Sequence, residues 1–408
     1  MYNICDYNAV GDGKTLCTHA VQNAIDDCFS DGGGTVVVPN GTYLIGTIIL
    51  KSNVELNLMP NAVLLASDNC ECFPEREIKH AETKFLPRGR NACIIYAEES
   101  ENISITGKGT IDCNGDKFVI EDKDFWMPYR RIDKPTPPRA VFFAGCKNVK
   151  VTDVTLQNSP AGWSYFIHDC DYVSFSRVKI LSRVDYPNND GIHINCSRNV
   201  TVSDSFIICG DDCIVARANS ASLKENKVCE NITVTNCTLK TWCNAIRIGW
   251  LNDGTVRNCV FSNLIISESS VGIGIVMPGR GAERTLDEGR ESTLIENISF
   301  NNIIFDKGRS CPVLISISDC GVTDVTAVRN ISISNFRAIS AEFPFIKGRK
   351  NNHIANLKMT DCIFEKTSES YNYGARAKAI YGDDNHHGIV LEYIDNIQLN
   401  NVTLTEKK

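Results

Sequence analysis

A short pattern of alternating apolar and polar residues returns along most of the 408-residue chain. Each copy starts with Asn or a substitute, as in NISITG at Asn102, NVTVSD at Asn199 and NISISN at Asn330. From Asn148 to Asn258, successive copies are 24, 27, 32 and 27 residues apart. β-branched residues at period two, repeated at this spacing without long helical stretches between them, indicate a solenoid of stacked strands.

The fold class that this repeat predicts is all-β: a right-handed parallel β-helix of about ten coils, formed by a single domain over residues 1–408. A β-sandwich or a propeller fits less well, because the copies lack hairpin dipeptides at regular short spacing. The recurrent Asn suits a position that needs a tight turn or a ladder of side-chain amides.

Two segments depart from the repeat. Residues 16–29 carry apolar side chains at helical spacing, with Thr18 as the expected N-cap and glycines after the end. They predict an amphipathic helix that caps the N-terminal end of the solenoid. Residues 116–138 are charged, aromatic and rich in Pro, which predicts an inserted loop near a groove.

Four strand segments align with one another, and they start at Asp190, Asp212, Asn244 and Val271. Because side chains alternate between the two faces of a strand, this register predicts two inward columns and an outward set. The inward columns are Ile192, Ile214, Ile246 and Ile273, then Ile194, Ala216, Ile248 and Ile275. The outward set is His193, Val215, Arg247 and Gly274, then Asn195, Arg217, Gly249 and Val276.

Three carboxylates fall at the leading edge of these strands. Asp190 and Asp212 occupy the same place in neighbouring coils, about 5 Å apart at the backbone, with Asp211 beside them. An ionised carboxylate within an apolar run is costly, and like charges so close raise the pKa of at least one of them. We therefore predict a protonated acid next to an ionised base. The alternative is a vestigial or calcium-binding cluster in a protein that is not an enzyme.

The order of the phrases NNDG and GDDC resembles glycoside hydrolase family 28, the polygalacturonase and rhamnogalacturonase group. Asp211 and Asp212 follow Asp190 by 21 and 22 residues. The phrases DYNAVGDGKT, GGGTVVVPNGTY and NSPAGWSYFIHDCD are similar to other parts of that family, so the resemblance covers most of the chain. It implies hydrolysis of a glycosidic bond with inversion at the anomeric carbon. Carried over by position, Asp211 protonates the leaving oxygen, while Asp190 and Asp212 activate the attacking water.

Two family phrases are altered here, and both bear on the substrate. The family's Gly-His-Gly falls at residues 243–245, where Asn244 replaces the histidine. Its Arg-Ile-Lys falls at residues 274–276, which read Gly-Ile-Val and lack the cations that would hold a galacturonate carboxylate. We hypothesise that Arg217 and Arg247, which share the outward columns of these positions, supply the clamp instead. The alternative is that both are solvated surface charges.

Three further residues complete the predicted substrate-binding set. His193 orients Asp190, contacts the sugar, or is an exposed strand histidine with neither role. Asn244 either forms a hydrogen bond with substrate or fills a turn. Trp250 stacks on a sugar ring, or is a half-buried aromatic residue of the solenoid.

Other functions fit the same fold. A polysaccharide lyase would use calcium and a basic residue against a uronate, and would release an unsaturated product. A non-catalytic glycan-binding solenoid would keep aromatic residues on its groove without three clustered acids. An epimerase acting on polymer is a weaker third, and the GDDC spacing favours hydrolysis.

Composition and charge narrow the partners. The net charge of −7 and the pI near 5.6 argue against a nucleic-acid or anionic-membrane surface, so the expected partner is an oligosaccharide. No export signal and no run of about 18 apolar residues occur, so we expect a cytoplasmic protein that acts from the ends of short chains. The oligomeric state stays open.

The nineteen cysteines recur singly within apolar strands, which predicts reduced core residues. Neither a pair of CxxC motifs nor HExxH occurs, so we expect no metal and no cofactor. His386 and His387, in the stretch GDDNHHG, are expected to be solvated.

Overall fold

The computed structural model describes residues 1–121, 131–250, 252–277, 291–317, 325–367 and 388–406. The chain divides into two compact units. The first comprises Met1–Asp211 and Ser222–Glu225, and the second comprises Asp212–Ala221 and Asn226–Lys408. Within the described ranges, no helix is both long and apolar enough to cross a bilayer. That residues 1–408 form a single domain stays a prediction.

Three-stranded coils make up much of the first unit. The earlier elements are β1 (Tyr2–Asn3), η1 (Ile4–Tyr7), β2 (Asp12–Leu16), β3 (Gly34–Val38), β4 (Gly41–Ile45), β5 (Ile48–Ile49), β6 (Val54–Leu58) and β7 (Ala62–Ala66). The later coils are β8 (Cys93–Glu98), β9 (Glu101–Gly107) and β10 (Thr110–Asp112); β13 (Arg139–Ala144), β14 (Lys147–Thr152) and β15 (Thr155–Gln157); β16 (Trp163–His168), β17 (Asp171–Ser176) and β18 (Lys179–Leu181); β19 (Ile192–Asn195), β20 (Arg198–Ser203) and β21 (Phe206–Ile208).

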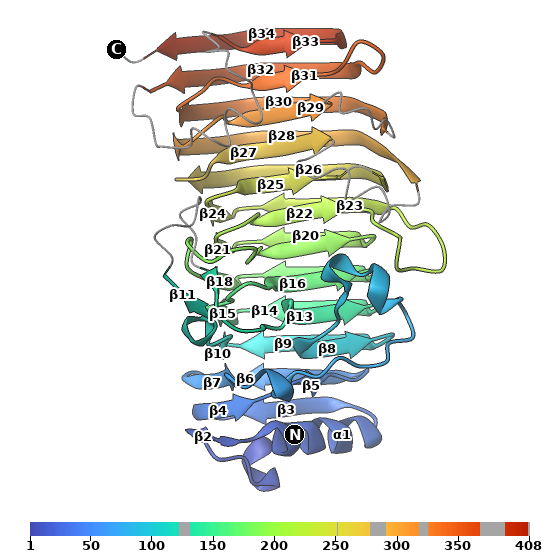
Figure 1. Ribbon diagram of the computed structural model, residues 1–408, viewed down its shortest axis with the longest axis vertical. Helices are drawn as coiled ribbons and strands as arrows, with labels where there is room; N and C mark the ends of the chain where they lie inside the picture. Colours follow the sequence, from blue (N-terminus) through green and yellow to red (C-terminus); the bar gives the residue numbers. More distant parts are fainter. Residues whose placement is uncertain (122–130, 251, 278–290, 318–324, 368–387, 407–408) are drawn as a thin grey trace. The chain divides into compact units, whose positions relative to one another are not determined.

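Each strand of these coils pairs in parallel with its counterpart in the next coil. β13 pairs with β16, and β16 pairs with β19 (Figure 1). The register places Val149 beside Val173, and Val173 beside Val200, in a buried column. Apolar residues at every second position thus stack into a continuous core, and the predicted parallel β-helix is confirmed.

The first unit also contains the expected cap helix, α1 (Thr18–Ser30), which packs beside β3 (Figure 1). Its buried face is formed by Val21, Ala24, Ile25 and Cys28. The expected Thr18 cap is wrong, because the N-cap is Cys17, whose side chain makes no capping hydrogen bond. The Thr18 hydroxyl instead accepts from the Gly46 N–H at 2.7 Å, which ties the helix to the chain after β4.

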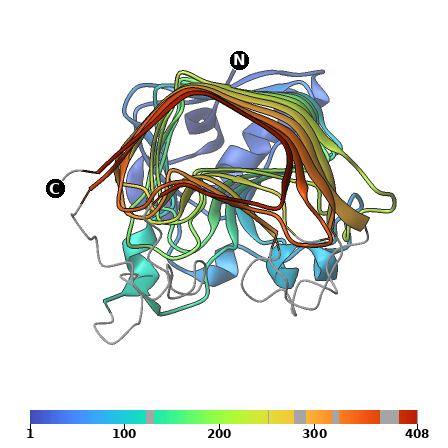
Figure 2. The ribbon, with the colours of Figure 1, turned by 90° about the horizontal axis from the view of Figure 1, so that it is seen from above.

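The second unit repeats the parallel stacking with longer strands. They are β22 (Ile214–Arg217), β23 (Cys229–Thr235), β24 (Thr238–Lys240), β25 (Asn244–Ile248), β26 (Asp253–Ser267), β27 (Val271–Met277), β28 (Glu291–Gly308), β29 (Val313–Ile317), β30 (Val325–Ser340), β31 (Phe345–Lys347), β32 (Ile354–Lys366), β33 (Val390–Glu392) and β34 (Ile394–Glu406). In Figure 2 the orange and red coils of this unit follow nearly the same path. Ile246 pairs with Ile214 and with Ile273, which confirms that part of the predicted inward column.

The predicted loop over residues 116–138 is described in part. It contains the short helix η5 (Gly115–Lys117) and an antiparallel pair formed by β11 (Val119–Ile120) and β12 (Arg131–Ile132). Residues 122–130 lie outside the described residues, as do His386 and His387.

The cysteines in the described ranges are all free, and most of them are buried in the core. Burial raises the pKa of the Cys93 thiol to about 11, and it raises the pKa of Cys259 to about 12. These thiols behave as small apolar side chains, as predicted.

The recurrent asparagines lie at the corners of the coils in the left-handed conformation. In the second unit, Asn297, Asn330 and Asn356 each have a φ of 57°. The Asn330 amide donates to the Asn297 side-chain oxygen at 2.9 Å and accepts from Asn356 at 2.8 Å. Asn tolerates this backbone better than most residues, so one residue type forms both the turn and the ladder that the sequence predicts.

Replacing Asn330 tests the two roles separately. We expect Asn330→Ala to lower the free energy of unfolding by about 2 kcal/mol, because it removes ladder hydrogen bonds and strains a positive-φ backbone. Asn330→Gly removes the same amide without the strain, so it should cost less. The unfolding midpoint in urea checks the order, and equal midpoints for the two variants would contradict it.

Candidate active site

The first unit places Asp190 just before β19, beside the start of β16. The Ser164 N–H donates to the Asp190 carbonyl at 2.9 Å, which fixes the backbone of the acid. The carboxylate Oδ2 lies 3.3 Å from Nδ1 of His193, and both side chains are almost fully buried. An imidazole at this position restricts the orientation of the carboxylate.

His193 itself is covered by an aromatic ring. Only 1% of its surface is exposed, and its ring stacks on Trp163 with the centroids 3.7 Å apart. The exposed strand histidine among our expectations is therefore wrong. An outward position on a strand does not reach solvent when a side chain from the neighbouring coil covers it.

Asp211 lies in a turn that the two asparagines before Asp190, Asn188 and Asn189, hold in place. A side chain at Gly210 would lie 2.1 Å from the Tyr186 carbonyl oxygen, so only glycine fits before the acid. The Gly210 N–H donates to the buried Asn189 side chain at 2.6 Å. Asn188 donates to the Asp211 carboxylate at 3.2 Å. The two asparagines before Asp190 therefore position Asp211, a role that sequence reasoning missed although both lie within the NNDG phrase.

Asp212, in the second unit, is held by Asn244. The backbone N–H and the side-chain Nδ2 of Asn244 both donate to Asp212 Oδ1, at 3.0 and 2.6 Å. A side chain at Gly274 would begin 2.7 Å from Asn244 Oδ1. The two departures from the family phrases are thus linked, because an arginine at 274 would collide with the amide that replaces the histidine.

The predicted clamp residue Arg217 is engaged inside the second unit. Its guanidinium donates to both carboxylate oxygens of Asp253, at 2.8 and 2.7 Å. Asp253 is completely buried and Arg217 is 7% exposed. The alternative that Arg217 is a solvated surface charge is therefore wrong, and the bidentate pair already uses two of its five donors.

Arg247 and Trp250 form a second contact in this unit. Arg247 is 8% exposed, and it donates to the Val276 carbonyl at 3.0 Å. The Trp250 ring lies 4.4 Å from the Arg247 guanidinium and 4.6 Å from that of Arg217. Arg247 therefore spans the coil that carries glycine at 274, while Trp250 packs against cations within the protein.

The structure thus brings Asp190 together with His193, Asp212 with Asn244, and the two arginines with Trp250. The boundary between the units falls between Asp211 and Asp212. The lateral approach of Asp190 to Asp212 stays a prediction, as do the catalytic and substrate-binding roles of all eight residues.

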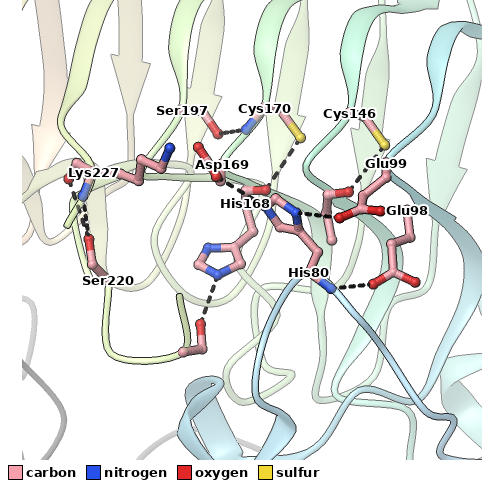
Figure 3. Close-up of polar contacts among 12 residues, drawn as sticks. His80, Glu98, Glu99, Cys146, His168, Asp169, Cys170, Ser197, Ser220 and Lys227 are labelled. Carbon is pink, nitrogen blue, oxygen red and sulfur yellow. Dashed lines mark hydrogen bonds and ion pairs between the residues drawn. The ribbon is translucent and has the colours of Figure 1, made fainter. Parts of the chain in front are cut away.

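A long loop of the first unit, residues 67–92, carries further polar groups that the repeat could not indicate. It is anchored by His80, which lies between two carboxylates (Figure 3). Nε2 of His80 is 3.0 Å from Asp169, and Nδ1 is 3.4 Å from Glu99. Glu98 accepts from the backbone N–H groups of Lys79 and His80.

The carboxylates that surround His80 change its protonation. The hydrogen bond to Asp169 raises the pKa of His80, and partial burial opposes that shift. The nearby Glu99 carboxylate also raises the pKa of His80. In its protonated form, His80 can donate to both carboxylates and so tie the loop to two coils.

The stacked coils define the fold class, a parallel β-helix, and the family model below defines the enzyme class, a glycosyl hydrolase. A model of the glycosyl hydrolases family 28 matches residues 35–315, and the chain belongs to this family. The right-handed fold agrees with an exopolygalacturonase structure from Thermotoga maritima, with a TM-score of 0.74 and 22% identity over 99% of this chain and 91% of that one.

Two curated relatives carry related names. An exopolygalacturonase from Arabidopsis thaliana is 27% identical over 332 residues, which cover 74% of this chain and 72% of the relative. An exo-poly-α-D-galacturonosidase from Dickeya chrysanthemi is 27% identical over 313 residues, covering 66% of this chain. The chain spans about half the length of the Dickeya protein, 51%.

Removing Asp253 tests whether Arg217 is held by an internal ion pair. We expect Asp253→Ala to lower the free energy of unfolding by about 3 kcal/mol, because a buried guanidinium loses its bidentate partner. The double variant Arg217→Met with Asp253→Leu should recover most of that loss. Thermal unfolding measures both, and an Asp253→Ala protein as stable as the wild type would contradict the internal role.

The pH dependence of stability tests the His80 anchor. A raised pKa in the folded state means that the stabilisation is full below the pKa of unfolded histidine, near 6.5, and is lost as the pH rises through the folded pKa. We expect His80→Gln to cost about 1 kcal/mol at pH 5.5 and much less at pH 9. Unfolding midpoints at both pH values check this, and a cost that does not change with pH would overturn it.

Proposed function

We propose that the protein hydrolyses α-linked galacturonate oligosaccharides derived from pectin, removing units from the chain end with inversion of configuration. The observation that carries this proposal is the turn that presents Asp211, built by Asn188, Asn189 and Gly210 next to Asp190. Membership of family 28 and the names of the exo-acting relatives support the choice of bond and substrate.

Asp211 is the general acid in this proposal. Asp211 is half-buried, so part of the residue is accessible to a leaving oxygen, and Asn188 donates a hydrogen bond to its carboxylate. An acetal opens when one carboxyl donates a proton to that oxygen while another accepts a proton from water on the opposite face.

Asp190 and Asp212 are the acceptors for the protons of the attacking water. Each is buried and is held by a neighbouring side chain, His193 for Asp190 and Asn244 for Asp212. Carboxylates fixed in this way need little reorganisation when they accept a proton, which suits a base. Arg217, Arg247 and Trp250 are proposed to line the substrate-binding side of the second unit.

Substituting the acids individually tests these roles. We expect Asp211→Asn to reduce turnover of an α-1,4-linked galacturonate trimer by about 10²- to 10⁴-fold, because an amide cannot donate the proton. Asp190→Asn and Asp212→Asn should fall in the same range. Asp153→Asn is the matched control, since Asp153 forms an exposed ion pair with Arg177 and should leave turnover unchanged.

The product identifies the reaction class. Hydrolysis with inversion releases a saturated sugar whose first-formed anomer is β, which NMR detects before mutarotation, and exo-action releases the monomer first. An unsaturated, ultraviolet-absorbing product that disappears with a chelator would identify a lyase instead. Full turnover by Asp211→Asn would refute the acid assignment.

A further inference from the structure

Arg88 is a positively charged residue with no role so far, and it lies in the loop of the first unit that His80 anchors. Arg88 lies within the short helix η4 (Pro87–Gly89) in the left-handed conformation, with a φ of 67°. Its Nη1 donates to the carbonyl of Ala161. Ala161 precedes the start of β16, where the Ser164 N–H donates to the carbonyl of Asp190. The guanidinium therefore contacts the segment that runs alongside Asp190.

The buried side chain of Arg139 fixes the backbone around Arg88. This side chain is 1% exposed, and it donates to the Pro87 carbonyl at 2.7 Å and to the Arg90 carbonyl at 2.5 Å. Its guanidinium also lies over the rings of Phe142, Trp163 and Phe166. One buried group thus binds the carbonyls on both sides of Arg88, and this fixes the backbone of Arg88.

The rest of the loop is anchored as firmly. Arg90 pairs with Glu75 at 2.8 Å and donates to the Thr136 carbonyl at 3.1 Å. The Glu75 carboxylate also accepts from the backbone N–H groups of Asn91 and Ala92. The left-handed conformation of Arg88 is unfavourable for a residue with a side chain and persists because these contacts impose it.

Arg88 differs from Arg217 and Arg247 in what its guanidinium already contacts. The residue as a whole is exposed, and within the described part of the chain its side chain has one polar contact, the carbonyl of Ala161. A guanidinium has five N–H donors in a planar fork that matches a carboxylate. Arg217, by contrast, gives its fork to Asp253, and Arg247 is almost fully buried.

The electrostatic surroundings agree with this placement. The surrounding protein desolvates the guanidinium and lowers the pKa of Arg88, whereas Asp190 and Asp211 both act to raise it. Both carboxylates therefore lie near enough to the guanidinium to interact with its charge. A positive group held within reach of both acids would meet whatever sugar unit they act on.

We propose that Arg88 binds the carboxylate of the uronic acid unit at the scissile bond. It supplies a positive charge of the kind that the family phrase carries and that Gly274 and Val276 lack, and it belongs to a loop of the first unit. This inference rests on the proposed function, because it assumes that the substrate is a uronate.

Two substrates that differ only in charge test the proposal. We expect Arg88→Ala to reduce kcat/KM for the galacturonate trimer by about 10- to 100-fold, mainly through KM, with partial recovery in Arg88→Lys. On the methyl-esterified trimer, which has no carboxylate charge, Arg88→Ala should perform like the wild type. Arg177→Ala removes one exposed positive charge that is paired with Asp153, and it should leave both substrates unaffected.

The outcomes separate this inference from the proposed function. An unchanged kcat/KM in Arg88→Ala would overturn it. An equal loss on the acid and on the ester would also overturn it, because Arg88 would then act on Asp190 and Asp211 rather than on the substrate. Calorimetric binding of the acid trimer to Asp211→Asn, with and without Arg88→Ala, gives the answer even without turnover. Arg88-dependent binding by a protein that cleaves neither substrate would refute hydrolysis and support the carboxylate site.

Discussion

The constraint on which the structure depends is a corner of each coil that requires positive φ. Asparagine satisfies it from Asn102 to Asn396, and its amide then donates to the corner of the adjacent coil. Within each unit this repeated contact keeps successive strands in register, so that apolar residues stack into one core. Tyr172 occupies one such corner with a φ of 55°, and there Asn199 donates to the Asp171 carboxylate instead. The positive φ is therefore kept even where the ladder of amides is interrupted.

The candidate site lies where the coils are interrupted by longer connections. The chain between β18 and β19 carries Asn188 to Asp190, and the turn after β21 carries Gly210 and Asp211. Polar groups there are satisfied by one another rather than by the ladder. The same holds in the second unit, where the Asn244 amide donates to Asp212 and Gly274 leaves room for that amide. Such close contacts fix the carboxylates more firmly than exposed loops would.

Sequence alone predicted the parts of the molecule that follow the repeat. The pairing of Ile246 with Ile214 and Ile273 came from period-two alternation, which backbone geometry enforces. Alternation could not predict the ion pair of Arg217 with Asp253 or the stacking of Trp163 on His193. Both contacts join an outward position to a residue in another coil. Periodicity assigns a face, but the neighbouring coil decides whether that face is buried.

The arginines of the two units illustrate what decides whether a cation can bind substrate. The buried Arg139 has a pKa lowered to about 9 by desolvation, and it donates to carbonyls of the loop, which gives it a structural task. Arg217 would have to release Asp253 before its fork could bind another carboxylate, at a cost of several kcal/mol. Arg88 needs no such exchange, since the group that it contacts in the described part of the chain is a neutral carbonyl. A cation that the protein has positioned but not neutralised can therefore bind a substrate carboxylate at the lowest cost in free energy.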